Sequence, residues 1–323
     1  MAEASTGCTV VIATRNRCQY LVQALQSALL QEQVSLEVVV VDDASSDTTA
    51  EYLGQVSDGR VRVIHHAQAV GVSEARNSGI NAARRPWIAF LDDDDLWAPT
   101  KLAEQLAAVR RTGASWSYTG VAYFTDGVRT ARIARRVAPL QGVLQSNPTP
   151  TPSSVIVSRA VLRAVGGFDP ELTLMADWDL WIRVTQFGAP AIVAQPLVGY
   201  RHHLDQMSAS GRQARETVGH ERRYMMVKHR ELLRHERFPL GGRDFWLWRA
   251  GVCRSAGLRI RAAAIYLMIG VRYRSPRDLL RAVGPLVGER IMHFGQRTDA
   301  EALPELNWIA GPGLREHRTD PEC

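Results

Sequence analysis

The chain has 323 residues, 46% of them hydrophobic, which suits one large globular domain with or without an appendage. We find no uninterrupted apolar run of about 18 residues and no basic-then-apolar leader at the start, so we expect no membrane-spanning helix and, by default, a cytoplasmic protein. The net charge of +6 is uneven, because residues 212–295 hold about 18 Lys and Arg against 7 Asp and Glu.

The first half of the chain alternates apolar runs with amphipathic segments. Four runs are typical of buried strands: residues 9–13, 36–41, 61–65 and 87–91. Three intervening segments have helical spacing: residues 16–30, 48–53 and 72–85. We expect Asn16 and Ser73 to cap the first and third of these helices. Continuous apolar strands that alternate with helices predict a parallel sheet covered on both faces.

Two of the predicted strands end in clustered aspartates. Asp42 and Asp43 follow the second, and residues 92–95, all aspartate, follow the fourth. Parallel strands bring such ends to one edge of the sheet, where open α/β sheets bind nucleotides. Four adjacent carboxylates repel one another by roughly 1 kcal/mol per pair even in water, and a Mg²⁺ or Mn²⁺ ion with bound phosphates would explain them. An acidic turn before the next helix is the alternative.

The turn after the first strand, TRNR at residues 14–17, is not a glycine-rich phosphate loop. This disfavours a dinucleotide-dependent dehydrogenase and a P-loop NTPase. Without a cradle of backbone amides, a metal ion is the natural means of holding a diphosphate.

The remaining elements follow in order. We expect a helix over 99–111, two strands within 114–135 joined near 125–127, a proline-rich loop at 147–152, a strand over 153–157, a helix from 176 and a strand over 198–203. From residue 212 the pattern is helical, over 212–237, 244–274 and 277–294. The predicted domains are therefore residues 1–210, a helical region at 211–296 and a partly disordered tail at 297–323.

Five motifs in this order resemble the inverting family 2 glycosyltransferases of the GT-A fold. They are VVIATRNR (10–17), VVVVDDASSDTT (38–49), GVSEARNSGI (71–80), WIAFLDDDDLW (87–97) and GGFDPELTLMADWDLWIRV (166–184). The resemblance covers roughly residues 8–210. It implies an α/β GT-A fold, Rossmann-like, with a mostly parallel central sheet and helices on both faces, plus a C-terminal helical extension.

The resemblance implies a nucleotide-binding set at the sheet edge: Thr14, Arg15, Arg17, Asp43, Arg76, Asp92 and Asp93. In this set Asp43 would hydrogen-bond the base and Arg76 would approach the diphosphate.

For the metal, Mn²⁺ or Mg²⁺, the resemblance implies Asp92 and Asp94 as ligands in a D-x-D element. Because the run is wholly acidic, Asp93 and Asp95 form a D-x-D as well, and the family alignment, not the spacing, selects the first pair. His203 would complete the metal ligands, with His202 adjacent.

Inversion at the sugar carbon is a single displacement, which requires one base to take the proton of the acceptor hydroxyl. The resemblance implies Asp177 for this role. The family places a Glu-Asp pair here, and Ala176 replaces the Glu. Asp179 is the rival base, although two residues along a helix it faces another way.

The resemblance thus implies a metal-dependent inverting glycosyltransferase that moves a sugar from a nucleoside-diphosphate sugar to a hydroxyl of a glycan or lipid-linked acceptor, as in cell-envelope polysaccharide synthesis. A non-catalytic nucleotide-sugar-binding relative, favoured only by Ala176, is one alternative. A sugar-phosphate nucleotidyltransferase is another, but it would need a glycine-rich N-terminal loop.

The arginine-rimmed apolar helices after residue 211 could contact the inner face of a membrane as a peripheral site. Packing of those helices on one another and on the domain is the alternative. We expect no nucleic-acid partner.

Overall fold

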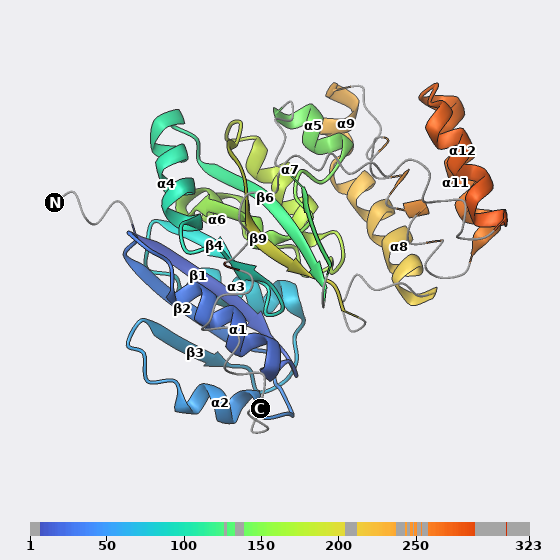
Figure 1. The fold of residues 1–323 in the computed structure, drawn as a ribbon. Helices are drawn as coiled ribbons and strands as arrows, with labels where there is room; N and C mark the ends of the chain where they lie inside the picture. The colour runs from blue at the N-terminus through green and yellow to red at the C-terminus, as the bar shows by residue number, and fades with distance from the viewer. Residues whose placement is uncertain are drawn as a thin grey trace. The chain divides into compact units, whose positions relative to one another are not determined.

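The computed structural model describes residues 7–125, 128–132, 139–203, 212–236 and 258–287, and the single positions 243, 246, 247, 249, 250, 253 and 308. The chain divides into two compact units (Figure 1). The first comprises Met1–Pro139, Thr149–His202 and Ala302–Cys323, and the second Leu140–Pro148 and His203–Glu301.

The first unit is built on one mixed sheet. Its strands are β1 (Cys8–Thr14), β2 (Leu36–Asp42), β3 (Val61–His65), β4 (Trp87–Phe90), β5 (Leu96–Trp97), β6 (Trp116–Thr125), β7 (Val128–Arg132), β8 (Val155–Ser158) and β9 (Ala191–Arg201). Among the described residues their order is β3-β2-β1-β4-β8-β6-β9-β5, with β7 paired to β6. The four strands predicted from apolar runs are confirmed, and they are mutually parallel. β8 is antiparallel to both β4 and β6.

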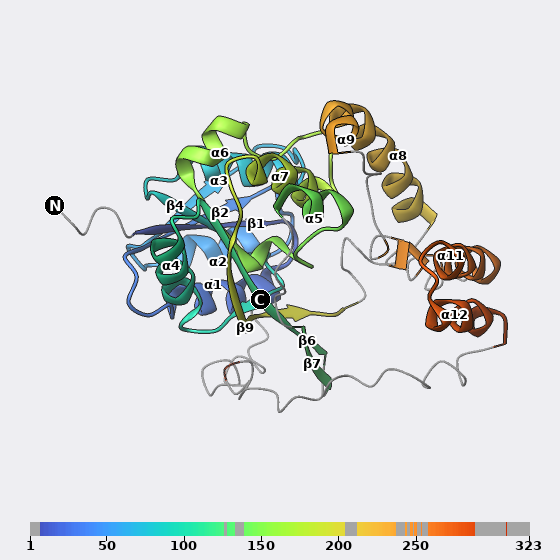
Figure 2. The ribbon, with the colours of Figure 1, turned by 90° about the horizontal axis from the view of Figure 1, so that it is seen from above.

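Helices cover both faces of this sheet, as predicted (Figure 2). They are α1 (Cys18–Leu29), α2 (Thr49–Gln55), α3 (Val72–Ala82), α4 (Lys101–Thr112), α6 (Arg159–Val165) and α7 (Ala176–Thr185). α1 and α4 share one core cluster with the strand residues Val10, Ile12, Val38 and Val40. α3 packs on the opposite face, where Gly79 lies so close to Val11 that a Cβ would stand 2.3 Å from a valine methyl carbon.

Both expected helix caps are wrong, because distant segments use these side chains. Asn16 has a left-handed backbone with φ of 55°, and α1 begins two residues later. Its side chain accepts a hydrogen bond from the backbone N–H of Ser46 at 2.7 Å. Ser73 lies inside α3, and its hydroxyl donates to the carbonyl of Leu172 at 2.6 Å.

The second unit is helical in its described parts, as predicted. It contains α5 (Pro139–Gln145), whose first residue belongs to the first unit, α8 (Arg212–Lys228), α9 (Arg230–Glu236), α11 (Arg259–Arg272) and α12 (Pro276–Val287). Apart from position 308, the tail at 297–323 falls outside the described residues. In the described part of the chain, no helix combines the length and hydropathy needed to cross a bilayer.

Lys101, at the start of α4, is wholly buried. Its amino group has no hydrogen-bond partner among the described residues and lies 3.9 Å from the centre of the Trp97 ring. Burial lowers the pKa of Lys101 to about 7, opposed by the Cys8 thiol. A cation–π contact compensates only part of the cost of burying an ammonium group.

We therefore expect Lys101→Met to stabilise the protein at pH 7 by roughly 1–4 kcal/mol. The folded pKa lies below the unfolded one, so the unfolded chain binds more protons between about pH 7 and 10, and wild-type stability rises with pH there. Urea unfolding at pH 7 and pH 9 should show the advantage of the variant shrinking at the higher pH. A variant less stable than wild type at pH 7 would mean that the ammonium group is well satisfied.

Candidate functional site

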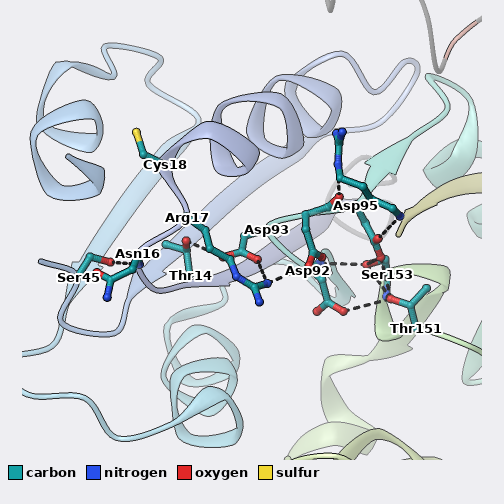
Figure 3. A network of polar contacts seen from close by, with 12 residues as sticks. Thr14, Asn16, Arg17, Cys18, Ser45, Asp92, Asp93, Asp95, Thr151 and Ser153 are labelled. Carbon is teal, nitrogen blue, oxygen red and sulfur yellow. Dashed lines mark hydrogen bonds and ion pairs between the residues drawn. The ribbon is translucent and has the colours of Figure 1, made fainter. Parts of the chain in front are cut away.

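The carboxyl ends of β1, β2 and β4 lie side by side. β1 is paired in parallel with both β2 and β4. The backbone N–H of Asp43 donates to the carbonyl of Thr14 at 2.9 Å. In Figure 3, Asp93 lies against Thr14 and Arg17. The two acidic segments therefore flank the turn after β1, at one edge of the sheet.

The turn after β1 binds the acidic run directly. The Thr14 hydroxyl donates to Asp93 Oδ2 at 2.8 Å. Arg17 Nη1 lies 3.1 Å from Asp93 Oδ1 and 2.9 Å from Asp94 Oδ2, so one guanidinium joins both carboxylates. Arg15, in the same turn, is exposed.

Burial alternates along the acidic run. The side chains of Asp92 and Asp94 are 24% and 12% exposed, against 7% for Asp93 and 0% for Asp95. Burial, and next the charge of Asp94, raise the pKa of Asp93 to about 7 against the opposing effect of Arg17. Asp92 and Asp94 are thus the pair that solvent reaches more readily.

Asp95 anchors the acidic loop to the rest of the sheet. Its Oδ2 accepts hydrogen bonds from the hydroxyls of Thr151 at 2.8 Å and Ser153 at 2.7 Å, and its Oδ1 from the backbone N–H of Arg201 at 3.3 Å. Burial, then the charges of Asp94 and Asp92, raise the pKa of Asp95 well above its usual range.

The same two hydroxyl groups also contact Asp92. The Thr151 hydroxyl lies 3.1 Å from Asp92 Oδ2, and the Ser153 hydroxyl accepts from the Asp92 backbone N–H at 2.9 Å (Figure 3). Sequence reasoning missed Thr151. The available signal was weak: polar residues directly before β8, the strand that pairs with β4.

Arg76 connects α3 to the site. Its guanidinium forms an ion pair with Asp92 and lies 5.2 Å from the centre of the Phe168 ring. On the same helix, the Asn77 side chain donates to the carbonyl of Phe168 at 2.9 Å. α3 thereby fixes the loop that leads into α7.

Asp43 is buried, and its carboxylate contacts a histidine ring and two backbone N–H groups. Oδ1 lies 2.8 Å from His66 Nδ1 and accepts from the backbone N–H of Val70 at 2.9 Å, while Oδ2 accepts from that of Gly71 at 2.9 Å. Burial raises the pKa of Asp43, but these hydrogen bonds outweigh burial and hold the pKa below its ordinary value. Asp43 thus shapes the loop before α3, and sequence reasoning missed His66.

α7 carries the candidate base. Asp177 is half-buried in the first turn, where its Oδ1 accepts from the backbone N–H of Trp178 at 2.7 Å. One turn later Trp181 packs 6.3 Å, between ring centres, from Phe90 at the end of β4. Residues four apart share a helix face, so Asp177 lies on the side of α7 that packs toward the strand preceding the acidic run.

Asp179, the alternative candidate for the base, forms an ion pair with Arg183. It is wholly buried and its Oδ2 accepts from Arg183 Nη2 at 2.6 Å and Nε at 2.9 Å. Arg183 in turn donates to the carbonyls of Val165 and Gly167. This ion pair secures the turn between α6 and α7, which leaves Asp177 as the better candidate for the base.

The acidic edge fits a cation that arrives with a diphosphate. Within the described residues, no three His, Cys, Asp or Glu side chains converge as a preformed metal site. Mg²⁺ is usually held by one or two carboxylates together with substrate phosphates, and Asp92 and Asp94 offer that number of carboxylates. The predicted third ligand, His203, belongs to the second unit, and its role stays a prediction.

Residues 9–165 match the family model described as "Glycosyl transferase family 2". The succinoglycan biosynthesis protein ExoO of Rhizobium meliloti is 44% identical over 106 residues, which are 33% of this chain and 30% of ExoO. The chain thus matches under a third of the length of that relative. WfaP of Escherichia coli, named a UDP-Glc:α-D-GlcNAc-diphosphoundecaprenol β-1,3-glucosyltransferase, is 26% identical over 205 residues, 62% of this chain and 80% of WfaP.

Solved structures agree on the fold. The crystal structure of S. aureus TarS 1–349 in complex with UDP-GlcNAc has a TM-score of 0.58 at 16% identity, and covers 85% of this chain and 89% of the TarS chain. At that identity the likeness shows the fold alone. The predicted GT-A α/β fold with a helical C-terminal part is confirmed.

Proposed function

Because residues 9–165 match the model of glycosyl transferase family 2, we propose that the chain is a metal-dependent, inverting glycosyltransferase that uses a nucleoside-diphosphate sugar. One observation carries the proposal: the more exposed carboxylates, Asp92 and Asp94, stand at the edge of the sheet beside two arginines, Arg17 and Arg76. This arrangement suits a diphosphate and its cation.

The relatives suggest the substrates. WfaP is named for a UDP-glucose donor and a diphosphoundecaprenol-linked acceptor, and the TarS structure contains UDP-GlcNAc. We infer a UDP-sugar donor and a hydroxyl on a lipid-linked glycan of the cell envelope. A lipid-linked acceptor would place the enzyme at the inner face of a membrane, as a peripheral protein.

For catalysis, Asp92 and Asp94 would hold Mn²⁺ or Mg²⁺. Such a cation supplies charge neutralisation for the departing diphosphate. In the structure, Arg17 and Arg76 form ion pairs with Asp94 and Asp92. With the donor bound, each guanidinium would turn to the oxygens of the diphosphate. The turn carrying Thr14 and Arg15 would lie against the nucleotide, with Asp43 shaping the base pocket.

The transfer itself is one displacement. The acceptor oxygen forms a bond to the anomeric carbon as the bond from that carbon to the diphosphate oxygen breaks, and the electron pair leaves with the diphosphate. The proton of the acceptor hydroxyl passes to the Asp177 carboxylate. One inversion of the sugar carbon results.

The direct test is release of UDP from a panel of UDP-sugars, with and without a diphosphoundecaprenol-linked acceptor, in Mn²⁺ and in excess EDTA. We expect acceptor-stimulated release in Mn²⁺ with one sugar. Binding without release would favour the non-catalytic alternative. Pyrophosphate release from a nucleoside triphosphate and a sugar phosphate would favour a nucleotidyltransferase.

Thr151 should act as a positioning residue for the metal-binding carboxylates, because its hydroxyl lies between Asp92 and Asp95. We expect Thr151→Val to weaken Mn²⁺ binding roughly 10- to 100-fold, as measured by Mn²⁺ titration in the presence of UDP. Thr119→Val, which removes another buried hydroxyl in β6, is the matched control. If both variants bind Mn²⁺ as wild type does, Thr151 does not position the carboxylates.

A further inference from the structure

The second unit has an apolar surface that its own core does not use. On α11, Ile260, Leu267 and Val271 are 78%, 52% and 67% exposed. On α12, Leu280 and Val283 are 74% and 52% exposed. The spacing places each set on one side of its helix. We call these five residues the apolar stripe; two neighbouring helices that both expose such a set differ from the scattered apolar residues of an ordinary surface.

The opposite sides of both helices are already buried. Ala262, Tyr266 and Ile269 of α11 belong to the core cluster of this unit. Asp278 of α12 is wholly buried, with Arg243 Nη2 at 2.7 Å and Arg281 Nη1 at 3.0 Å. The rotation of each helix is therefore fixed, and the stripe is the outward side of a packed structure.

The two halves of the stripe lie on the same side of the helix pair. α11 and α12 contact each other where Gly270 meets Leu279, close enough that a Cβ on the glycine would lie 2.5 Å from a leucine methyl carbon. At roughly 100° per residue, the stripe residues of each helix lie about a quarter turn around the helix axis from its contact residue. The direction of this rotation, viewed along each helix from its N-terminus to its C-terminus, is the same for α11 and α12. The short link at 273–275 makes the helices antiparallel, and Figure 2 shows them side by side. Because the helices run antiparallel, the same direction of rotation brings the stripe residues of both helices to one common face of the pair.

Within α11 and the described part of α12, the exposed charges have one sign. From residue 259 to 283 the sequence has six arginines and one acidic residue, the buried Asp278. On α11, Arg261 and Arg272 directly follow the stripe residues Ile260 and Val271. On α12, Arg277 lies about one turn before Leu280, and all three arginines are exposed. Long arginine stems can lie along an apolar surface while their guanidinium groups reach lipid phosphates. A second copy of the same face would bring arginines against arginines.

We propose that the apolar stripe and its arginines dock the protein on the surface of an anionic lipid bilayer, with the aliphatic side chains inserted at the level of the headgroups. The inference rests on the proposed function in one respect: a lipid-linked acceptor explains why the enzyme would bind there. The surface itself is observed independently of the active site.

The test is co-sedimentation of the full chain with vesicles of equal parts phosphatidylglycerol and phosphatidylcholine, and with vesicles of phosphatidylcholine alone. We expect binding to the anionic vesicles that weakens with salt. Leu267→Gln with Leu280→Gln should lower the partition coefficient roughly 10- to 100-fold. Arg261→Gln with Arg277→Gln should lower it about 10-fold on anionic vesicles only.

Leu30→Gln with Phe187→Gln, which removes two exposed apolar residues of the first unit, is the matched control and should bind as wild type does. The proposal would be overturned if the wild-type protein did not co-sediment with anionic vesicles, or if the stripe variant bound them as strongly as wild type. So would a dimer that the stripe variant disrupts, since a second copy would then cover the face. UDP release without lipid should be equal in wild type and stripe variant, which separates a failure of docking from a failure of the proposed enzyme.

Discussion

Asp94→Asn is expected to lower sugar transfer roughly 1,000-fold. The substitution keeps the shape of the side chain but removes the charge of one of the two carboxylates that would hold the cation. It also removes the ion pair with Arg17, whose other partner, Asp93, remains. Initial rates of UDP release at saturating donor, measured across a Mn²⁺ titration, would report both the loss of rate and the higher Mn²⁺ concentration needed for half-maximal activity.

The control for Asp94→Asn is Asp58→Asn. Asp58 belongs to the same unit, is partly exposed and pairs with Arg60. Its substitution therefore removes an equivalent charge at a position away from the acidic edge. The control should keep wild-type activity, because exposed ion pairs contribute little to stability. Activity of Asp94→Asn within about tenfold of wild type would exclude Asp94 as a ligand on which catalysis depends.

Asp177→Asn is expected to lower kcat by roughly 100- to 10,000-fold while leaving donor binding unchanged. The amide can still accept a hydrogen bond from the backbone of Trp178, so α7 should keep its first turn, but it cannot take a proton. Single-turnover transfer, together with a separate titration of UDP binding, would distinguish a lost base from a damaged nucleotide site.

Asp179→Asn provides the contrast within the same helix. Asp179 is buried against Arg183, so its loss should appear mainly as a lower Tm. A variant of Asp177 that keeps full turnover would remove it as the base. A kcat loss confined to the Asp179 variant, with Tm unchanged, would transfer the role to the rival.

The sheet and its acidic edge could be predicted from the sequence because both depend on local pattern. Apolar runs define β1 to β4, and parallel pairing then forces Asp43 and Asp94 to one edge of the sheet. What could not be predicted depends on contacts between distant segments. His66 at Asp43 and Thr151 at Asp95 are set by the folded chain, as is the alternating burial along residues 92–95.

The wrong helix caps and the second unit show the same limit. Asn16 and Ser73 have the right chemistry for caps, but Ser46 and Leu172 use them. In α11 the sequence shows apolar residues at helical spacing without distinguishing the packed Ile269 from the exposed Val271. Only tertiary packing separates the core side of such a helix from its exposed side.

The central claim is that a cation links the carboxylates of the acidic edge to the diphosphate of the donor. The most direct measurement is the Tm of the wild-type protein with UDP in Mn²⁺ and in excess EDTA. We expect UDP to raise the Tm by several degrees in Mn²⁺, because ligand binding to the folded state stabilises it, and to have little effect in EDTA. An equal rise in Tm under both conditions would contradict the claim.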